Sequence, residues 1–372
     1  MIPSPIRSLL LILGTASAIG VLSAGASAAP ATAATKVCKL GDAADCTARC
    51  TNKEQDSCAV LGWMYVYGKG VGKDETKGVA TIQKSCNSGS ARGCVDLAYL
   101  YEYGIGMPKD EARALTDYKK ACSEKNAYGC VHLGMMYDYG KGVPADKAKA
   151  TALYKKACED GDTQGCYSVG LRYLYGMGVP KDETKALAFF QTSCDKGDGH
   201  GCAYLGSLYE SGHGVPKDEA KAVTYYQGSC NDHDTFACTH LGNVYEVGKG
   251  GIAKDPVKAA SLYKESCDLH EALACSELGD LYATGVGVTK DDVKATALYK
   301  QSCDGYGMQG CSDFGWRTYS GIGTTKDEAK GKALLTKSCV QYNESACGKL
   351  DVIDPAAGKA ARNQRDSGSS AN

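Results

Sequence analysis

The sequence has almost no excess charge of either sign, and it is poor in two of the three aromatic residue types. Its formal net charge is −1 over 372 residues, and its lysines and arginines do not gather into a basic stripe. Such a stripe is the electrostatic footprint of proteins that bind nucleic acid, so we exclude a nucleic-acid partner. Phenylalanine occurs 4 times and tryptophan twice, whereas tyrosine occurs 24 times. A tyrosine ring packs while its hydroxyl stays in water, so this bias predicts many half-buried positions.

The sequence also lacks the common motifs of metal, nucleotide and cofactor sites. Its six histidines include no His-x-x-x-His pair and no His-Glu-x-x-His run, so zinc hydrolase chemistry has no support. Glycine-rich segments such as Gly140-Lys141-Gly142 share only their composition with phosphate-binding loops, because they recur along the chain as turns between helices. We therefore expect neither a metal ion nor a cofactor.

Long apolar runs are missing as well, and the clearest short one lies near the N-terminus. The run Leu9–Leu22 is shorter than the ~20 apolar residues that a membrane-spanning helix needs. Arg7 precedes it and the small residues Ala26–Ala28 follow it, which is the order of a signal sequence with its cleavage site. Segment 1–28 is therefore predicted to be a cleaved signal peptide rather than a membrane anchor, and 29–37 a linker. The mature chain is expected to be secreted or periplasmic, with no membrane span.

Cysteine, by contrast, is abundant, with 20 residues in ten pairs whose members lie eight residues apart. Cysteines of zinc sites are usually two to four residues apart, so this spacing favours disulfides, which form in oxidising compartments. The predicted bridges are Cys38–Cys46, Cys50–Cys58, Cys86–Cys94, Cys122–Cys130, Cys158–Cys166, Cys194–Cys202, Cys230–Cys238, Cys267–Cys275, Cys303–Cys311 and Cys339–Cys347. Cys46 and Cys50 are only four residues apart, so the pairing among the first four cysteines stays open.

The cysteine pairs also define a repeat. From Cys50 onward they recur every 36 residues, with one step of 37 residues between Cys230 and Cys267. A fixed period of this length is the signature of a solenoid, in which each unit contacts only its neighbours. Each unit has room for two helices. In the second copy, the spacing of apolar residues predicts a helix A from about Cys94 to Tyr103, and Asp110 is the expected N-cap of a helix B.

These units predict the domain organisation and an all-α fold. Residues 38–57 are expected to form an N-terminal capping partial repeat. Residues 58–353 are expected to form a solenoid of eight 36-residue helix-pair repeats and a C-terminal capping helix. The tail 354–372, composed largely of small and polar residues, is predicted to be disordered. Each disulfide closes a loop of nine residues, which stabilises the fold by about 2–3 kcal/mol in the chain-entropy model.

The residues that vary between copies on one face of helix A are the candidate binding surface. The fifth and ninth residues after the helix-A cysteine lie four positions apart, on one face of the helix. In the first four copies these positions are aromatic or apolar, with acidic residues between them. The predicted groove consists of Trp63, Tyr67, Tyr99, Tyr103, Met135, Tyr139, Leu171 and Tyr175, with Glu102 and Asp138. This strip suits an extended peptide with basic and hydrophobic residues, unless the tyrosines only pack against the next repeat.

The repeat also resembles a known family. Leu205-Gly206, Tyr209 and the run from Gly212 to Asp218 follow the pattern Leu-Gly-x-x-Tyr and Gly-x-Gly-Val-x-Lys-Asp of the Sel1-like repeat, a relative of the tetratricopeptide repeat. With its paired cysteines, the chain between residues 50 and 347 resembles the Helicobacter cysteine-rich protein family. The resemblance implies a right-handed α/α solenoid that serves mainly as a platform for protein or peptide partners.

The same resemblance raises an enzymatic alternative, since some members of that family are described as penicillin-binding proteins or slow β-lactamases. Serine β-lactamases use Ser-x-x-Lys together with Ser-Asp-Asn and Lys-Thr-Gly. Here Ser-x-x-Lys begins at Ser193 and at Ser261, and neither companion motif is present. These serines are the candidate nucleophiles, and a β-lactam or a peptidoglycan fragment is the implied ligand. A further alternative is an assembly factor for envelope or respiratory complexes, but we expect first an exported scaffold that binds a partner in its groove.

Overall fold

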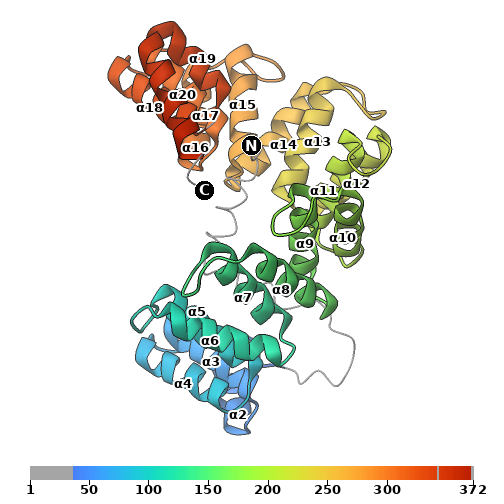
Figure 1. Ribbon diagram of the computed structural model, residues 1–372, viewed down its shortest axis with the longest axis vertical. Coiled ribbons are helices and arrows are strands. Elements are labelled where there is room, and N and C mark those ends of the chain that lie inside the picture. Colours follow the sequence, from blue (N-terminus) through green and yellow to red (C-terminus); the bar gives the residue numbers. More distant parts are fainter. Residues whose placement is uncertain (1–36, 342, 370–372) are drawn as a thin grey trace. The chain divides into compact units, whose positions relative to one another are not determined.

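The computed structural model describes residues 37–341 and 343–369, and all the regular secondary structure in these residues is α-helical. The predicted signal peptide at 1–28, and all but the last residue of the linker at 29–37, lie outside the described residues. Two compact units make up the described chain (Figure 1). The N-terminal unit contains the residues up to Gly201 and His213–Val215, and the C-terminal unit contains Cys202–Gly212 and the chain from Pro216 onward. None of the described helices is both long and apolar enough to cross a membrane.

Each of the eight repeats consists of two helices of 13 residues, and helices of 9, 10 and 15 residues flank the series. The helices A are α3 (Gln55–Tyr67), α5 (Ala91–Tyr103), α7 (Ala127–Tyr139), α9 (Thr163–Tyr175), α11 (Gly199–Ser211), α13 (Thr235–Val247), α15 (Ala272–Thr284) and α17 (Met308–Ser320). The helices B are α4 (Glu75–Asn87), α6 (Glu111–Ser123), α8 (Lys147–Glu159), α10 (Glu183–Asp195), α12 (Glu219–Asn231), α14 (Pro256–Asp268), α16 (Asp292–Asp304) and α18 (Glu328–Val340). The flanking helices are α2 (Ala43–Thr51), α19 (Glu344–Ile353) and α20 (Pro355–Ser369).

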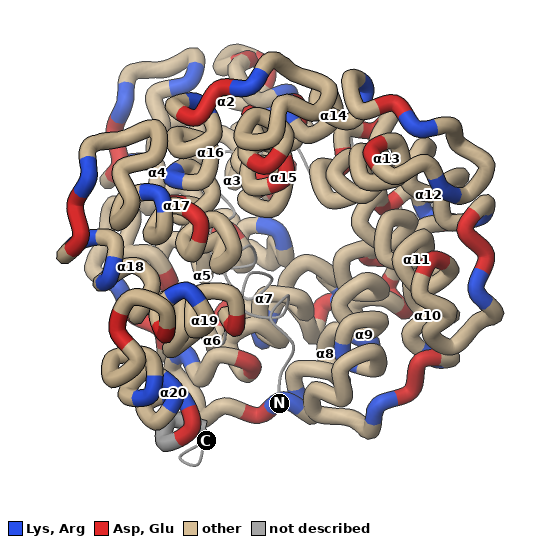
Figure 2. The backbone as a smooth tube through the Cα atoms, turned by 90° about the horizontal axis from the view of Figure 1, so that it is seen from above, with Lys and Arg blue, Asp and Glu red and all other residues tan. Residues whose placement is uncertain are grey.

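Side-chain caps set where the helices begin. Helix A of the second repeat starts three residues before its predicted start, because Ser90 accepts a hydrogen bond from the Gly93 N–H at 2.8 Å. Helix B starts where the sequence predicts, and Asp110 accepts from the Arg113 N–H at 3.0 Å. Several segments that lead into the helices B carry lysine beside acidic residues and appear as adjacent blue and red stretches in Figure 2. In one such segment Lys109 Nζ lies 2.6 Å from Glu111 Oε1.

In five of the eight repeats, the third to the seventh, the two helices pack through a glycine on helix A and a ring on helix B. A Cβ atom on Gly134 of α7 would lie 2.8 Å from Cε1 of Tyr154, and one on Gly170 of α9 would lie 2.6 Å from Cε1 of Phe190. Both rings are buried, with exposed fractions of 1% and 0%. At these two positions a Cβ atom would come too close to the ring, so the Leu-Gly of these repeats has a packing cause.

From Cys86 onward, the cysteines pair across the turn between one helix B and the next helix A. Nine pairs have Cα–Cα distances between 4.3 and 5.0 Å. Cys194 and Cys202 are disulfide-bonded too, and no described cysteine is free. The pairing that the sequence left open is Cys38 with Cys46 and Cys50 with Cys58.

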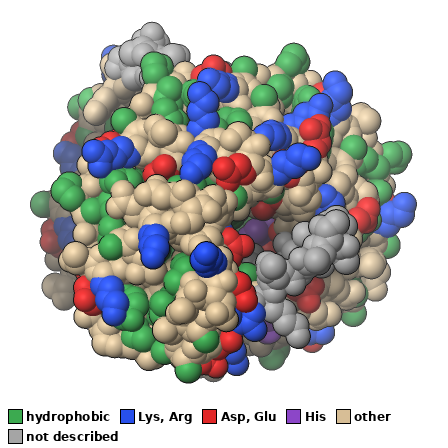
Figure 3. Space-filling view, turned by 90° about the horizontal axis from the view of Figure 1, so that it is seen from below, with side chains coloured by type: hydrophobic (Ala, Val, Ile, Leu, Met, Phe, Trp, Pro, Cys, Tyr) green, Lys and Arg blue, Asp and Glu red, His purple; other side chains and the backbone are tan. Residues whose placement is uncertain are grey.

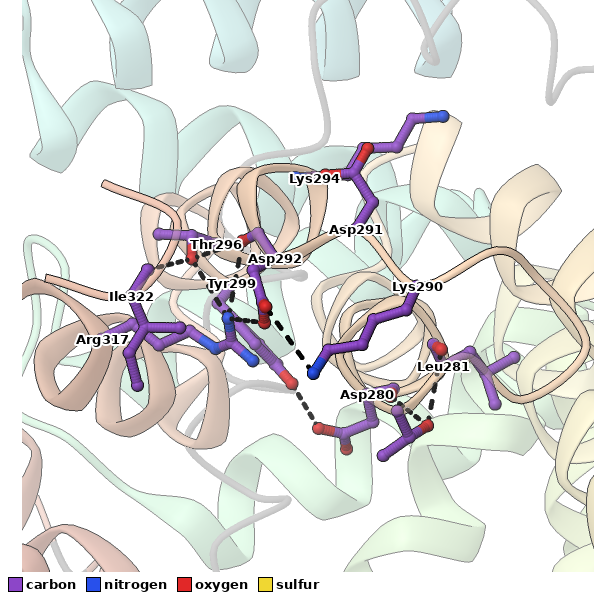
Figure 4. A network of polar contacts seen from close by, with 11 residues as sticks. Asp280, Leu281, Lys290, Asp291, Asp292, Lys294, Thr296, Tyr299, Arg317 and Ile322 are labelled. Carbon is purple, nitrogen blue, oxygen red and sulfur yellow. Dashed lines mark hydrogen bonds and ion pairs between the residues drawn. The ribbon is translucent and has the colours of Figure 1, made fainter. Parts of the chain in front are cut away.

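Polar side chains join successive repeats beside the disulfides. In the C-terminal unit, Arg317 of α17 donates to Asp292 Oδ1 at 3.0 Å, at the start of α16 (Figure 4). Thr296 of α16 donates to the carbonyl oxygen of Ile322 at 2.8 Å, in the turn that follows α17. These contacts connect a helix B to helix A of the next repeat and to its turn.

The end of the chain differs from the prediction. The disordered tail predicted at 354–372 is wrong for residues 355–369, which form α20 and pack on α18 and α19. Asp354 caps α20 by accepting from the Ala357 N–H at 2.9 Å, and Ala361 is buried. Alanines at helical spacing supply a narrow apolar stripe that the small-residue composition concealed.

Candidate functional site

Four tyrosines, 36 residues apart, end successive helices A of the N-terminal unit. This tyrosine line consists of Tyr67, Tyr103, Tyr139 and Tyr175, the last residues of α3, α5, α7 and α9. Each of these helices packs on the next, so the line follows one face of the unit. All four side chains are partly exposed, and Tyr103 is the most exposed at 44%. Burial raises the pKa of all four hydroxyls, to about 12 for Tyr103 and Tyr139, so they remain protonated hydrogen-bond donors at neutral pH.

The fifth-position residues of the predicted groove form its floor rather than its surface. Trp63, Tyr99 and Leu171 are at most 7% exposed, and Met135 is half-buried. The Trp63 ring stacks on Tyr67 with centroids 5.3 Å apart and meets Tyr99 edge-on at 5.9 Å. The Tyr99 centroid in turn lies 4.4 Å from that of Tyr103. The predicted groove residues of the first two repeats therefore form one aromatic ladder.

The two acidic residues of the predicted groove are occupied in holding repeats together. Glu102 accepts from the Tyr118 hydroxyl at 3.0 Å and from Lys141 Nζ at 2.7 Å. Asp138 accepts two hydrogen bonds from Arg172, one of them at 2.9 Å, and both side chains are buried. The contacts with Lys141 and Arg172 link one repeat to the next, so these carboxylates stabilise the stack and do not present free charge to a ligand.

Sequence reasoning missed a further pair on the same face, Arg92 and Asp96 of α5. Asp96 is 5% exposed, and its Oδ2 lies 3.8 Å from Arg92 Nε, which is too long for a hydrogen bond. Burial raises the pKa of Asp96 to about 6, although Arg92 and the indole N–H of Trp63 favour its ionised form. The signal that would have found this pair is two opposite charges four residues apart, on either side of a helix-A cysteine.

A histidine extends the aromatic ladder into the third repeat. His132 of α7 stacks on Tyr118 with centroids 5.1 Å apart and lies 4.4 Å from the centroid of Tyr128. Burial lowers the pKa of His132 to about 4, so the imidazole is neutral at physiological pH. The histidine therefore acts as one more ring of the ladder.

Ser193, the first candidate nucleophile, occupies a structural position of the repeat. Its side chain is fully buried, and its Oγ lies 2.9 Å from the carbonyl oxygen of Thr163 and 2.5 Å from Asp198 Oδ2. The serines at the same position of other repeats, Ser85 and Ser302, donate to the matching carbonyl oxygens at 2.6 and 2.7 Å. This hydroxyl therefore connects a helix B to the helix A before it.

Ser261, the second candidate, is exposed on α14. The lysine of each Ser-x-x-Lys run is engaged elsewhere, because Lys196 Nζ donates to the carbonyl oxygen of Cys158 at 3.3 Å and Lys264 Nζ to Asp268 at 2.5 Å. In both runs the lysine of the motif is therefore paired with another group.

The corresponding face of the C-terminal unit is more polar. Its fifth-position residues are Ser207, Asn243, Asp280 and Trp316. Glu246 and Asp280 accept from the hydroxyls of Tyr263 and Tyr299, at 2.9 and 2.5 Å. Burial and neighbouring carboxylates raise the pKa of Glu277 to about 7. The aromatic surface is therefore a property of the N-terminal unit.

We also considered metal-binding clusters and cavities among the described residues, and neither adds a candidate site. No group of three or more His, Cys, Asp or Glu in residues 37–341 and 343–369 is placed to hold a metal ion. A cavity of about 420 Å³ in the C-terminal unit is lined partly by Lys300 and Asp304, which pair with each other at 2.6 Å. Elsewhere positive and negative side chains are interspersed, as Figure 3 shows for one face.

Comparisons with known proteins agree with this architecture. The family model of the Sel1 repeat matches residues 55–90, 91–126, 127–162, 163–198, 199–232, 235–270, 272–305 and 315–341. A comparison with curated proteins yields no match.

Three solved structures illustrate the similarity. A Sel1 repeat protein from Oxalobacter formigenes is 28% identical with a TM-score of 0.53, and the match covers 57% of this chain and 85% of that one. A protective antigen of uropathogenic Escherichia coli strains, which displays an SLR fold, is 22% identical with a TM-score of 0.50 over 87% and 77% of the two chains. Helicobacter pylori cysteine rich protein B is 32% identical with a TM-score of 0.29, over 36% of this chain and 94% of that one.

Proposed function

Because the chain belongs to the Sel1 repeat family, whose repeats generally mediate contacts between proteins, we propose that it is an exported scaffold that binds a partner protein. The proposed site is the tyrosine line of the N-terminal unit. Its proposed occupant is an extended segment of the partner that contains basic and apolar residues. The disulfides support an oxidising, extracytoplasmic location, since such bonds are rare where thiols are kept reduced.

The proposal rests on one observation: the exposed ring of Tyr103 is supported by buried aromatic rings. Tyr103 is 44% exposed, yet its ring rests on Tyr99, which is buried and packed in turn on Trp63. A tyrosine held in this way offers a large contact area and loses little side-chain entropy when a partner binds. The same position recurs once per repeat, which suits an extended segment rather than a compact ligand.

The preference for basic residues is supported by a contact within the protein itself. Lys141 Nζ lies 5.6 Å from the centroid of the Tyr103 ring, so this ring already faces one cation. Electron-rich ring faces attract ammonium and guanidinium groups, with energies of about 0.5–1 kcal/mol at exposed sites. Lysine and arginine side chains of a partner are therefore suited to the remaining rings of the line.

The proposal is tested with the full-length oxidised protein and a fluorescein-labelled dodecapeptide that repeats lysine-leucine-serine four times. We expect saturable binding by fluorescence anisotropy, and Tyr103→Ala or Tyr139→Ala is expected to weaken it about five- to thirtyfold, the usual effect of losing an aromatic anchor. The matched control is Tyr306→Ala, which removes a tyrosine that is 59% exposed in the C-terminal unit and should leave the affinity unchanged. No binding by the wild type, or equal binding by the wild type and both variants, would refute the proposal.

A further inference from the structure

Buried polar atoms without a hydrogen-bond partner are concentrated at one place in the N-terminal unit. Nine such side-chain atoms occur in the described residues, and five of them belong to α3 and α5. The five are Gln55 Oε1, Trp63 Nε1, Tyr67 OH, Arg92 Nε and Asp96 Oδ2. Native proteins pair the large majority of such atoms, so a concentration of this kind indicates a place where a ligand can add hydrogen bonds.

Asp96 is the most costly of these groups to leave unpaired. It is 5% exposed, its Oδ2 has no hydrogen-bond partner, and the nearby Trp63 indole N–H and the Arg92 charge compensate its lost hydration only in part, because burial still raises its pKa. Its surroundings are the guanidinium of Arg92, the indole of Trp63, and the more distant charges or hydroxyls of Asp56 and Tyr128. Of these groups, only Arg92 carries a positive charge, and its contact is a loose ion pair at 3.8 Å.

The side chain of Arg92 is placed so that it can move away from Asp96. Its side chain is 38% exposed, whereas that of Asp96 is 7% exposed, so Arg92 is the partner of this pair that reaches the solvent. A long, partly exposed arginine can turn into water at little cost, and this movement uncovers Asp96 beside the ring of Trp63. The place then offers a buried negative charge next to an aromatic ring, which is the chemistry that binds an ammonium or guanidinium group.

We infer that Asp96 is the anchor for a lysine or arginine side chain of the partner segment, and that Arg92 occupies this anchor in the free protein. The inference rests on the proposed function, since the same segment would lie on the tyrosine line, where Tyr67 stacks on Trp63. It adds to that function a defined specificity: a positively charged residue of the partner opposite the first two repeats.

The test uses the full-length oxidised protein and the same lysine-leucine-serine dodecapeptide. Asp96→Asn is expected to weaken binding about tenfold or more, since a buried charge pair is lost. Arg92→Ala is expected to tighten binding several-fold, because the internal competitor is gone. The matched control is Asp313→Asn, which changes the carboxylate at the same repeat position in the C-terminal unit, where it pairs with Lys349, and it should have little effect. A peptide with glutamine in place of lysine should bind more weakly and should not respond to Asp96→Asn.

A second readout separates recognition from folding. The chain has only two tryptophans, so its indole N–H spectrum by NMR has two signals to assign. The peptide is expected to shift the Trp63 signal in the wild type and in Arg92→Ala, but not in Asp96→Asn. The inference is overturned if Asp96→Asn binds as tightly as the wild type, or if Arg92→Ala weakens binding as much as Asp96→Asn. If Tyr103→Ala still weakens binding in that case, the proposed function stands alone, whereas absence of any binding overturns both.

Discussion

The buried ion pair between Asp138 and Arg172 is expected to be a main support of the junction between the third and fourth repeats. The two side chains are 3% and 5% exposed, and two hydrogen bonds join them across 34 residues of sequence. Asp138→Ala leaves the guanidinium buried without its counter-charge, which costs about 3–5 kcal/mol of unfolding free energy. Replacing both partners, Asp138→Leu with Arg172→Met, removes the unpaired charge and is expected to recover most of that loss.

The assay is urea unfolding of the oxidised protein, followed by far-UV circular dichroism. The matched control is Glu159→Ala, which breaks an exposed pair with Lys155 whose side chains are 65% and 55% exposed. This control should change the stability by less than about 0.5 kcal/mol. The reasoning is refuted if Asp138→Ala costs no more than Glu159→Ala, or if the double variant is as unstable as Asp138→Ala.

Three further predictions concern packing, pH and the candidate nucleophiles. Gly134→Ala should lower the free energy of unfolding by about 1–3 kcal/mol, because its Cβ meets a buried ring. Gly228→Ala has open space around its Cβ and should stabilise α12 by about 0.5–1 kcal/mol. Urea unfolding of both variants checks this, and equal effects would contradict it. The pKa of Asp96 is raised from 3.8 to about 6, so the native state binds this proton more tightly than the unfolded chain does. The contribution of the protonated Asp96 to the free energy of unfolding is therefore full below about pH 4 and is lost as the pH rises to about 6. Asp96→Asn should therefore raise the melting temperature more at pH 7.5 than at pH 4, and an equal rise at both pH values would argue against a buried ionised carboxylate. Ser193→Ala should lower the free energy of unfolding by about 1 kcal/mol, and Ser261→Ala should not. Neither variant should change the rate at which a chromogenic β-lactam is hydrolysed. A fall in hydrolysis with unchanged stability would point to catalysis instead.

The spacing of the cysteines carries most of the information about the fold. A separation of eight residues matches the turn between two antiparallel helices, so both the pairing and the helix-pair repeat follow from it. The pairing of Cys38, Cys46, Cys50 and Cys58 does not follow, because two of them are four residues apart and spacing alone allows an exchange. The position of α2 and the packing around it decide that pairing.

The candidate site was predictable only as a line of positions. Helical periodicity identifies which residues share a face, and it brings Trp63, Tyr67, Tyr99 and Tyr103 together as observed. It does not show how deep each position lies, which depends on the neighbouring repeat. For this reason Glu102 was expected to be free to bind a ligand, whereas it pairs with Tyr118 and Lys141 from two other elements.

The C-terminal helix shows a limit of reasoning from composition. Residues 355–369 are rich in small and polar types, which predicts disorder when a segment is considered alone. The segment is ordered as α20 because α18 and α19 offer a surface on which Ala361 is buried, and because Arg362 donates to Asp351 at 2.9 Å. The alanine stripe of α20 is too narrow to predict a packed helix without the neighbouring helices that bury it.

The most direct test of the account is hydroxyl-radical footprinting of the full-length oxidised protein, with and without the lysine-leucine-serine peptide, read by mass spectrometry. Tyr103 and Tyr306, at 44% and 59% exposure, report on the proposed site and on an unrelated surface in the same sample. The account predicts that saturating peptide protects Tyr103 from oxidation and leaves Tyr306 unchanged. Peptide binding that leaves Tyr103 as reactive as before, or that protects Tyr306 instead, would contradict it.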